Sequence, residues 1–296
     1  MTGWLVLGGG GRLGSALMQR APAGSEAPPS QCLDLCDTVA LTEKIDTMRP
    51  CRVINCAALT DVDGCEAAPD RATEINGKAV GRLAQLCTER EIQLCQVSTD
   101  YVLSGENLLT EHQDYAPINV YGESKALGEQ LCLKANPDHL VVRVQWLFGG
   151  GRGDFVRFVR ERSLKGDLIP VIHDQVSIPS YTVDLARWMA MLFEVNASGI
   201  VHLANGGETS RWDQALSICE HLGHPPRLKP VSWDDLGRPA ARPRRSVLDT
   251  AHAVALTGHL FEVTDRFGEQ ASPRGAAGHP RSWRSAQEDW LEQLGC

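Results

Sequence analysis

A run of glycines close to the start of the chain constrains its fold more than any other feature. The apolar residues 5–7 lead directly into four consecutive glycines, and a helical pattern follows from about Leu13. Glycine is needed where the backbone turns with positive φ, approaches a pyrophosphate closely, or lets a helix pack on a strand. Two glycine spacings overlap here, and we favour the one formed by Gly8, Gly11 and Gly14. A strand, a turn and a helix in this order predict a dinucleotide-binding loop, because the helix N-terminus then faces the anion; a flexible turn is the alternative.

Short apolar runs and helical patterns alternate through the rest of the first half. Parallel strands joined by crossover helices have this rhythm, so we predict an α/β fold, a doubly wound parallel sheet of the Rossmann type. Within the longest predicted helix, apolar residues three or four apart form one buried stripe, with Asn76 as an exception. The predicted strands are residues 4–7, 53–57, 94–97, 140–144 and 199–203, and the predicted helices begin at 13 and span 71–90, 121–134 and 183–195.

A change of texture predicts a smaller C-terminal substrate-binding lobe. Residues 1–146 are expected to form the cofactor-binding domain, to which residues 176–212 return. Residues 147–175 and 213–296 are expected to form the lobe, because short helical pieces and prolines replace the regular alternation there. This lobe ends in a predicted helix over 283–291, and residues 264–279 before it have the composition of a poorly ordered segment.

Composition excludes several classes of function. The chain has 296 residues, 43% of them hydrophobic, and a formal net charge of −8, so it can bury a core and is not expected to bind nucleic acid. It contains no apolar run long enough to span a bilayer, so no membrane partner and a cytoplasmic location are expected. The ten cysteines are scattered, without CxxC pairs or clustered histidines. Buried free thiols are therefore favoured over disulfides, and no metal site is predicted.

An acidic residue follows the glycine loop at the spacing of a ribose-binding carboxylate. Asp34 lies twenty residues after Gly14, behind Cys32 and Leu33, where we expect a second strand to end. A carboxylate there disfavours the 2′-phosphate of NADP, so the sequence favours NADH over NADPH, although Arg12 offsets part of the repulsion. The alternative is an acidic cap before a helix that starts near residue 38.

Tyr121 and Lys125 form a candidate proton-transfer pair. They are four residues apart, so on a helix both side chains project from one face. A neighbouring ammonium stabilises a phenolate and moves the tyrosine pKa from about 10 toward neutrality. Because this spacing is common by chance, a solvated helix face is the alternative. About twenty residues earlier a predicted strand ends in Ser98 and Thr99, either of which could hydrogen-bond a carbonyl oxygen beside the tyrosine.

With these motifs the chain resembles the dTDP-4-dehydrorhamnose reductases, a family of extended short-chain dehydrogenases/reductases. The family shares an STDYVF motif and a YGxSKxxGE motif, which here occupy residues 98–103 and 121–129. The likeness continues through residues 53–66, 143–146, 174–186 and 242–249, and so covers nearly the whole chain. Several matches in the right order are far more specific than any single motif.

The resemblance implies roles for individual residues. Tyr121, Lys125 and Thr99 would be catalytic, and Thr99 and Asp100 would also touch the sugar. Trp146 would line the substrate pocket, with a core aromatic residue as the alternative reading. The cofactor would be held by Gly8, Gly11, Arg12, Leu13 and Gly14 at the pyrophosphate, by Asp34 and Leu35 at the adenosine, and by Ala57, Ala58, Thr60, Tyr121 and Lys125.

The sequence departs from the family pattern in three places. Asp154 stands where the family usually has Asn, and a carboxylate near a substrate diphosphate would repel it. Arg245 replaces an Asn, and together with Arg242 and Arg244 it could clamp a diphosphate or simply form a solvated basic loop. The third departure is the Gly/Arg-rich stretch before Trp283, for which the sequence offers no role.

These features together predict NAD(P)H-dependent reduction of a nucleotide-linked 4-keto-6-deoxy sugar. The resemblance implies dTDP-4-dehydro-β-L-rhamnose as the substrate and dTDP-L-rhamnose as the product. Two alternatives remain: an epimerase or reductase acting on another nucleotide sugar, and a non-catalytic subunit like the relative that serves methionine adenosyltransferase. The oligomeric state is not readable from the sequence, with a homodimer among the options.

Overall fold

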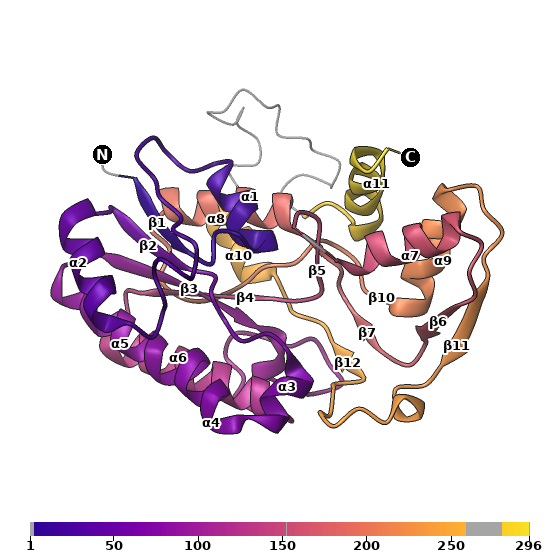
Figure 1. The fold of residues 1–296 in the computed structure, drawn as a ribbon, viewed down its shortest axis with the longest axis horizontal. Helices are drawn as coiled ribbons and strands as arrows, with labels where there is room; N and C mark the ends of the chain where they lie inside the picture. The colour runs from indigo at the N-terminus through magenta and orange to yellow at the C-terminus, as the bar shows by residue number, and fades with distance from the viewer. Residues whose placement is uncertain (1–2, 152, 259–279, 296) are drawn as a thin grey trace.

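Five parallel strands form the central sheet (Figure 1). The structure is a computed structural model that describes residues 3–151, 153–258 and 280–295. All five strands run the same way, so their carboxyl ends meet at one edge, which is where open α/β sheets bind ligands. In spatial order the strands are β1 (Trp4–Leu7), β2 (Arg52–Asn55), β3 (Gln93–Thr99), β4 (Leu140–Val144) and β9 (Gly199–His202).

Helices cover both faces of this sheet, as the doubly wound prediction requires (Figure 1). Successive strand residues point to opposite faces, so Val6 and Ile54 join one hydrophobic cluster while Leu5 and Val53 join the other. The first cluster packs against α1 (Arg12–Met18), α8 (Thr182–Glu194) and α10 (Ala251–Thr257), and the second against α2 (Thr38–Met48), α5 (Ala79–Glu89) and α6 (Val120–Ala135).

The helix predicted over residues 71–90 is continuous but not uniform. Its buried stripe is confirmed at Ala79, Leu83 and Leu86. Before α5 the chain forms a π-helical turn, and this turn buries the polar side chain of Asn76. The segments in order are α3 (Val62–Ala67), α4 (Pro69–Ala72), η1 (Thr73–Lys78) and α5.

The prediction of a second strand that ends at Cys32 and Leu33 is wrong. These residues lie in a turn, and among the described residues a single bridge, between Leu5 and Glu26, is all that meets the outer edge of β1. Pro28 and Pro29 follow that bridge, and because proline has no N–H to donate, the ladder cannot continue.

A second packed region is formed by segments that lie before and after β9 in the chain. Its hydrophobic cluster joins three helices, including the predicted C-terminal helix, and contains Val156, Ile218 and Trp290. The Gly/Arg-rich stretch lies mostly outside the described residues. The remaining elements of the fold are η2 (Asp100–Val102), β5 (Leu147–Phe148), α7 (Phe155–Leu164), β6 (Ile169–Ile172), β7 (Val176–Ser177), β8 (Ser180–Tyr181), β10 (Thr209–Ser210), α9 (Arg211–His221), β11 (Leu228–Val231), η3 (Asp234–Leu236), β12 (Arg245–Ser246) and α11 (Trp283–Gln293).

The described part of the chain bears on membrane-spanning helices and on disulfides. No helix within it is long and apolar enough to cross a membrane. All nine of its cysteines are free thiols, as predicted, and five of them are buried.

The glycine loop yields a stability prediction. A β-carbon on Gly14 would clash with the Gly8 carbonyl oxygen, whereas one on Gly10 would meet no atom within 4 Å. Gly14→Ala is therefore expected to lower the free energy of unfolding by roughly 1–3 kcal/mol through overpacking. Gly10→Ala, the matched control, should stay within about 1 kcal/mol of the wild type. Urea denaturation measures both, and equal losses in the two variants would contradict the packing argument.

Candidate active site

The helix α6 carries Tyr121 in its first turn and Lys125 one turn later. Asn119 caps this helix by accepting a hydrogen bond from Gly122 N (2.7 Å), and its side-chain amide donates to Ala241 O (2.8 Å). Gly122 has no room for a β-carbon, because its backbone presses against the Tyr101 carbonyl. The start of α6 is thus fixed against the segment that follows β3.

Tyr121 and Thr99 come together at the carboxyl end of β3, as the sequence predicted. The phenol of Tyr121 is hydrogen-bonded with Thr99, and this bond lowers the pKa of the tyrosine. Burial acts in the opposite direction and is the larger effect, so the pKa of Tyr121 lies above its ordinary value. We expected Lys125 to bring the pKa of Tyr121 below its ordinary value. That expectation is wrong, because desolvation dominates and raises this pKa.

Lys125 is 4% exposed, and its ammonium donates a hydrogen bond to Val97 O (2.7 Å). Burial lowers the pKa of Lys125 to about 8, while the carboxylate of Glu129 works against that shift. A lysine in this setting exchanges its proton close to neutral pH. The bond to Val97 also holds the helix against β3.

Asp100, predicted to touch the sugar, is 2% exposed and bridges two parts of the chain. Its carboxylate accepts hydrogen bonds from Thr99 Oγ1 (3.0 Å) and from Ser246 Oγ (2.6 Å). Burial raises the pKa of Asp100 to about 6, because these two hydrogen bonds compensate only part of the desolvation. Sequence reasoning missed Ser246, since nothing in its local pattern points to a partner 146 residues away.

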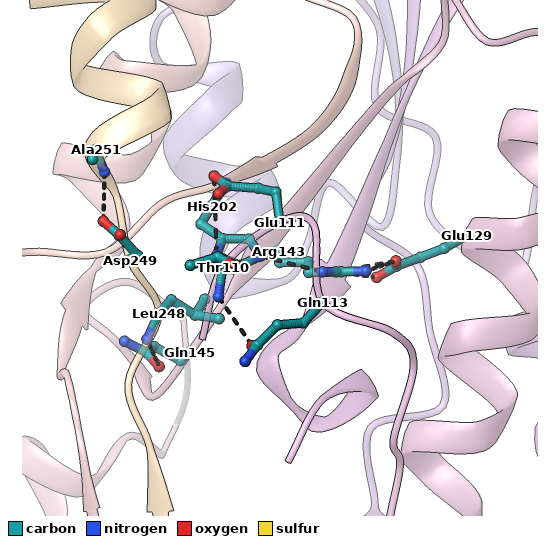
Figure 2. Close-up of polar contacts among 10 residues, drawn as sticks. All are labelled: Thr110, Glu111, Gln113, Glu129, Arg143, Gln145, His202, Leu248, Asp249 and Ala251. Carbon is teal, nitrogen blue, oxygen red and sulfur yellow. Dashed lines mark hydrogen bonds and ion pairs between the residues drawn. The ribbon is translucent and has the colours of Figure 1, made fainter. Parts of the chain in front are cut away.

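A buried polar network lies behind this site (Figure 2). Glu129 of α6 and Arg143 of β4 form an ion pair (2.7 Å) whose side chains are 0% and 1% exposed. Arg143 also contacts His202 of β9 (3.3 Å), and the backbone N–H of His202 donates to Glu111 (3.0 Å). Burial and the Arg143 charge lower the pKa of His202 to about 3, so this histidine is neutral. The network joins α6, the helix of Tyr121 and Lys125, to two strands of the sheet.

The glycine loop has the packing that its favoured spacing requires. Gly8 has a φ of 74°, and a β-carbon there would lie 2.6 Å from Ala57 N. Gly11 N donates to Gly8 O (2.9 Å) and closes the turn at the N-terminus of α1. Arg12 donates to Gly153 O (2.6 Å), and the Leu13 side chain is buried in the core.

The segment after β2 is shaped by Asn76. Its side chain accepts from Leu59 N (2.8 Å), donates to Leu59 O (3.0 Å), and donates to Ser124 Oγ of α6 (3.0 Å). Because of these bonds the predicted cofactor residues Ala57, Ala58 and Thr60 are held beside the catalytic helix. The isolated polar residue in an apolar stripe was the signal for this role.

Asp34 and Leu35 differ in their surroundings. Asp34 is exposed, and one carboxylate oxygen accepts from Cys36 N (2.8 Å) in a tight turn. The capping alternative is wrong for Asp34, because Asp37 caps α2 through Ala40 N (3.0 Å). Leu35 is buried in the same hydrophobic cluster as Leu7 and Ala57.

Trp146 lies just beyond β4, where the sequence placed it, with an unusual positive φ of 38°. Its ring is partly buried, and the guanidinium of Arg211 lies 3.6 Å from the ring centroid. Arg211 opens α9 and also lies over Phe155, at 4.7 Å. Sequence reasoning missed Arg211, because its contacts come from distant parts of the chain.

The departures from the family pattern have structural partners. Asp154 caps α7: its carboxylate accepts from Arg157 N (2.8 Å), Gly149 N (3.2 Å) and Trp290 Nε1 (3.1 Å). Both of its oxygens thus accept hydrogen bonds within the protein.

The three arginines near residue 244 are ion-paired, so a free basic clamp is not what they form. Arg242 binds Asp63 through both terminal nitrogens (2.9 and 3.0 Å). Arg244 pairs with Asp174 (2.7 Å), and Arg245 pairs with Glu208.

The fold and the Tyr–Lys arrangement together are those of extended short-chain dehydrogenases/reductases. The model of the RmlD substrate binding domain matches residues 1–264. A probable low-salt glycan biosynthesis reductase, Agl14, of Haloferax volcanii is 39% identical over 275 residues, covering 86% of this chain and 91% of the relative. A dTDP-4-dehydrorhamnose reductase of Mycolicibacterium smegmatis is 36% identical over 260 residues, covering 84% and 79%. The dTDP-4-dehydrorhamnose reductase of Bacillus anthracis, solved in complex with NADP, superposes with a TM-score of 0.85 at 26% identity, covering 98% of each chain.

The chain therefore belongs to the dTDP-4-dehydrorhamnose reductase family, as its motifs predicted.

Asp100 yields a pH prediction. Its pKa is raised from 3.8 to about 6 in the folded protein, so the folded state binds the proton more tightly than the unfolded state. Its contribution to stability is full below about pH 4 and is lost as the pH rises through 6. Relative to Asp100→Asn, the wild type should lose roughly 2–3 kcal/mol of unfolding free energy over this range. Denaturant titrations of both proteins from pH 4 to 7 measure it, and a pH-independent difference would contradict the assignment.

Proposed function

We propose that the protein reduces a nucleotide-linked 4-keto-6-deoxy sugar with NAD(P)H, and that this sugar is dTDP-4-dehydro-β-L-rhamnose. The observation that carries the proposal is the hydrogen bond of Tyr121 with Thr99, one helical turn from the buried Lys125. The names of the Mycolicibacterium and Bacillus relatives support the substrate class. The product would be dTDP-L-rhamnose.

The glycine loop fits a nicotinamide dinucleotide. Gly8 and Gly14 leave no room for side chains, and the space beyond Gly10 is open, so bare backbone faces outward beside the start of α1. Such a surface allows a pyrophosphate to approach the backbone N–H groups. Lys125 and Tyr121 would lie at the nicotinamide end, and Ala57, Ala58 and Thr60 would line the middle. When bound, the reduced cofactor supplies a hydride to the keto carbon.

The protein's own residues supply the proton and hold the ketone. Tyr121 would donate its phenolic proton to the oxygen of the ketone, and the Lys125 ammonium would stabilise the phenolate that remains. Thr99 would donate a hydrogen bond to the same oxygen when Asp100 is protonated and no longer accepts the Thr99 proton. Burial of all four groups strengthens these interactions, because little water competes for them.

The substrate would bind between the sheet and the second packed region. Trp146 lies at the end of β4 and offers a partly buried aromatic face. We propose the division expected from the sequence, with residues 147–175 and 213–296 as the substrate-binding lobe and a cytoplasmic enzyme as the whole. The bond between Asp100 and Ser246 joins the two regions at the site.

A preference for NADH over NADPH follows from Asp34. Its carboxylate is exposed, and its hydrogen bond is to a backbone N–H and not to a cation. Arg12, which could have offset its charge, reaches Gly153 O. The negative charge of Asp34 would therefore act against a 2′-phosphate.

Tyr121→Phe tests the chemistry. The variant lacks the proton donor, so kcat should fall by about 10²–10⁴-fold with little change in the KM of the cofactor. NADH oxidation with dTDP-4-dehydrorhamnose, followed at 340 nm, measures it. Tyr181→Phe removes a hydroxyl from a buried tyrosine stacked on Phe148 and should retain activity. Undiminished turnover in Tyr121→Phe would sink the mechanism.

Asp34→Asn tests the cofactor preference. Removal of the charge should raise the ratio of kcat/KM for NADPH to that for NADH by about tenfold. Asp37→Asn is the matched control, because it removes a nearby charge and keeps a capping side chain. A ratio that shifts equally in both variants would show that Asp34 does not act on the 2′ position.

A further inference from the structure

Arg211 is an arginine of the site region that neither the family motifs nor the sequence pattern pointed to. It follows β10 and opens α9, and its guanidinium lies between the rings of Trp146 and Phe155. Tyr101, Asp100 and Asp154 are close enough to interact with it electrostatically. These neighbours place it at the carboxyl edge of the sheet, between the catalytic residues and the second packed region.

The carboxylates near Arg211 are already occupied. Asp100 accepts from Thr99 and Ser246, and Asp154 accepts from two backbone N–H groups and from Trp290. Within the described part of the chain, Arg211 makes one hydrogen bond, from Nη1 to Gln214 Oε1 (3.0 Å). The N–H groups of Nε and Nη2 can therefore donate to a ligand.

This separates Arg211 from the arginines that the sequence suggested as a clamp. Arg242 and Arg244 give both terminal nitrogens to carboxylates. Arg245 gives one to the carboxylate of Glu208 and the other to a backbone carbonyl. Binding a phosphate there would compete with an existing ion pair, whereas Arg211 would gain a partner for a partly buried charge.

We propose that Arg211 binds the diphosphate that joins nucleoside and sugar in the substrate, and so determines the specificity for nucleotide-linked sugars. This inference rests on the proposed function, since it names the group that anchors that substrate. A guanidinium offers a planar pair of donors that matches two phosphate oxygens, and the rings of Trp146 and Phe155 hold its plane in one orientation.

The charge of Arg211 persists in this environment. Burial lowers the pKa of Arg211 to about 10, so the side chain remains a cation at neutral pH. Asp100 and Asp154 act on Arg211 only at longer range, because their oxygens are bonded elsewhere. A diphosphate would place a negative charge in direct contact with the guanidinium.

Direct binding of nucleotides tests the proposal without relying on catalysis. Isothermal titration of the full-length protein with dTDP and with thymidine gives the affinity that the phosphates add. In Arg211→Gln the affinity for dTDP should fall by about 10- to 100-fold, as for the loss of a charge-assisted pair of hydrogen bonds. The affinity for thymidine should stay the same. In Arg211→Lys, which retains the charge, part of the loss should be recovered.

A structural role for Arg211 predicts a different pattern. If the residue only supported Trp146, dTDP and thymidine would weaken by the same factor, and that outcome overturns the proposal, as does an unchanged dTDP affinity. Arg244→Gln, which removes an ion-paired arginine from the same region, is the matched control and should bind dTDP like the wild type. Loss of dTDP affinity in Arg211→Gln without any ketosugar reduction by the wild type would uphold the diphosphate site and reject the proposed reaction. Normal reduction by Arg211→Gln, with an unchanged KM for the sugar nucleotide, would do the reverse.

Discussion

The buried ion pair between Glu129 and Arg143 fixes α6, the helix that carries Tyr121 and Lys125. Both charges are removed from water, so neither can lose its partner without leaving an uncompensated charge, at a cost of about 3–5 kcal/mol. The same helix is tied to β3 through Lys125 and to the π-helical turn through Ser124. With three buried attachments along its length, α6 has little freedom to slide, and Tyr121 stays within reach of Thr99.

These attachments also set the electrostatics of the pair. Lys125 is desolvated, which favours its neutral form, but Glu129 lies one turn further along and favours its charged form. Glu129 is shared with Arg143, so its charge is largely neutralised before it reaches Lys125. The outcome is a lysine that titrates near neutrality in a site with almost no water. Lys125 and Glu129, which look like surface charges in the sequence, are therefore buried residues that hold α6 in place.

The sequence predicted what local patterns can encode. Tyr121 and Lys125 follow from helical spacing, Thr99 from its place at a strand end, and the glycine loop from strand, turn and helix order. The expected strand at residues 32–33 failed because two prolines deny the ladder its donors. Ser246 and Arg211 could not be predicted, since each acquires its role from residues far away in the chain. The bond of Asp154 with Trp290 of the last helix was beyond prediction for the same reason, whereas its other two donors, Gly149 N and Arg157 N, are close in the chain.

Thr99 shows how the buried carboxyl group controls the hydroxyl next to it. A threonine has one proton to donate, and here it goes to Asp100, while Tyr101 N donates to the same oxygen (3.3 Å). An ionised Asp100 therefore keeps the Thr99 proton, whereas the interaction that lowers the Tyr121 pKa needs Thr99 to donate to the phenolate. Protonation of Asp100, whose pKa is raised to about 6, would make its carboxyl group a donor and free the Thr99 proton for another acceptor. The protonation state of Asp100 thus decides whether the Thr99 hydroxyl donates to Asp100 or to another acceptor. The hydrogen bond from Ser246 to Asp100 connects this carboxyl group to the region that would hold the sugar.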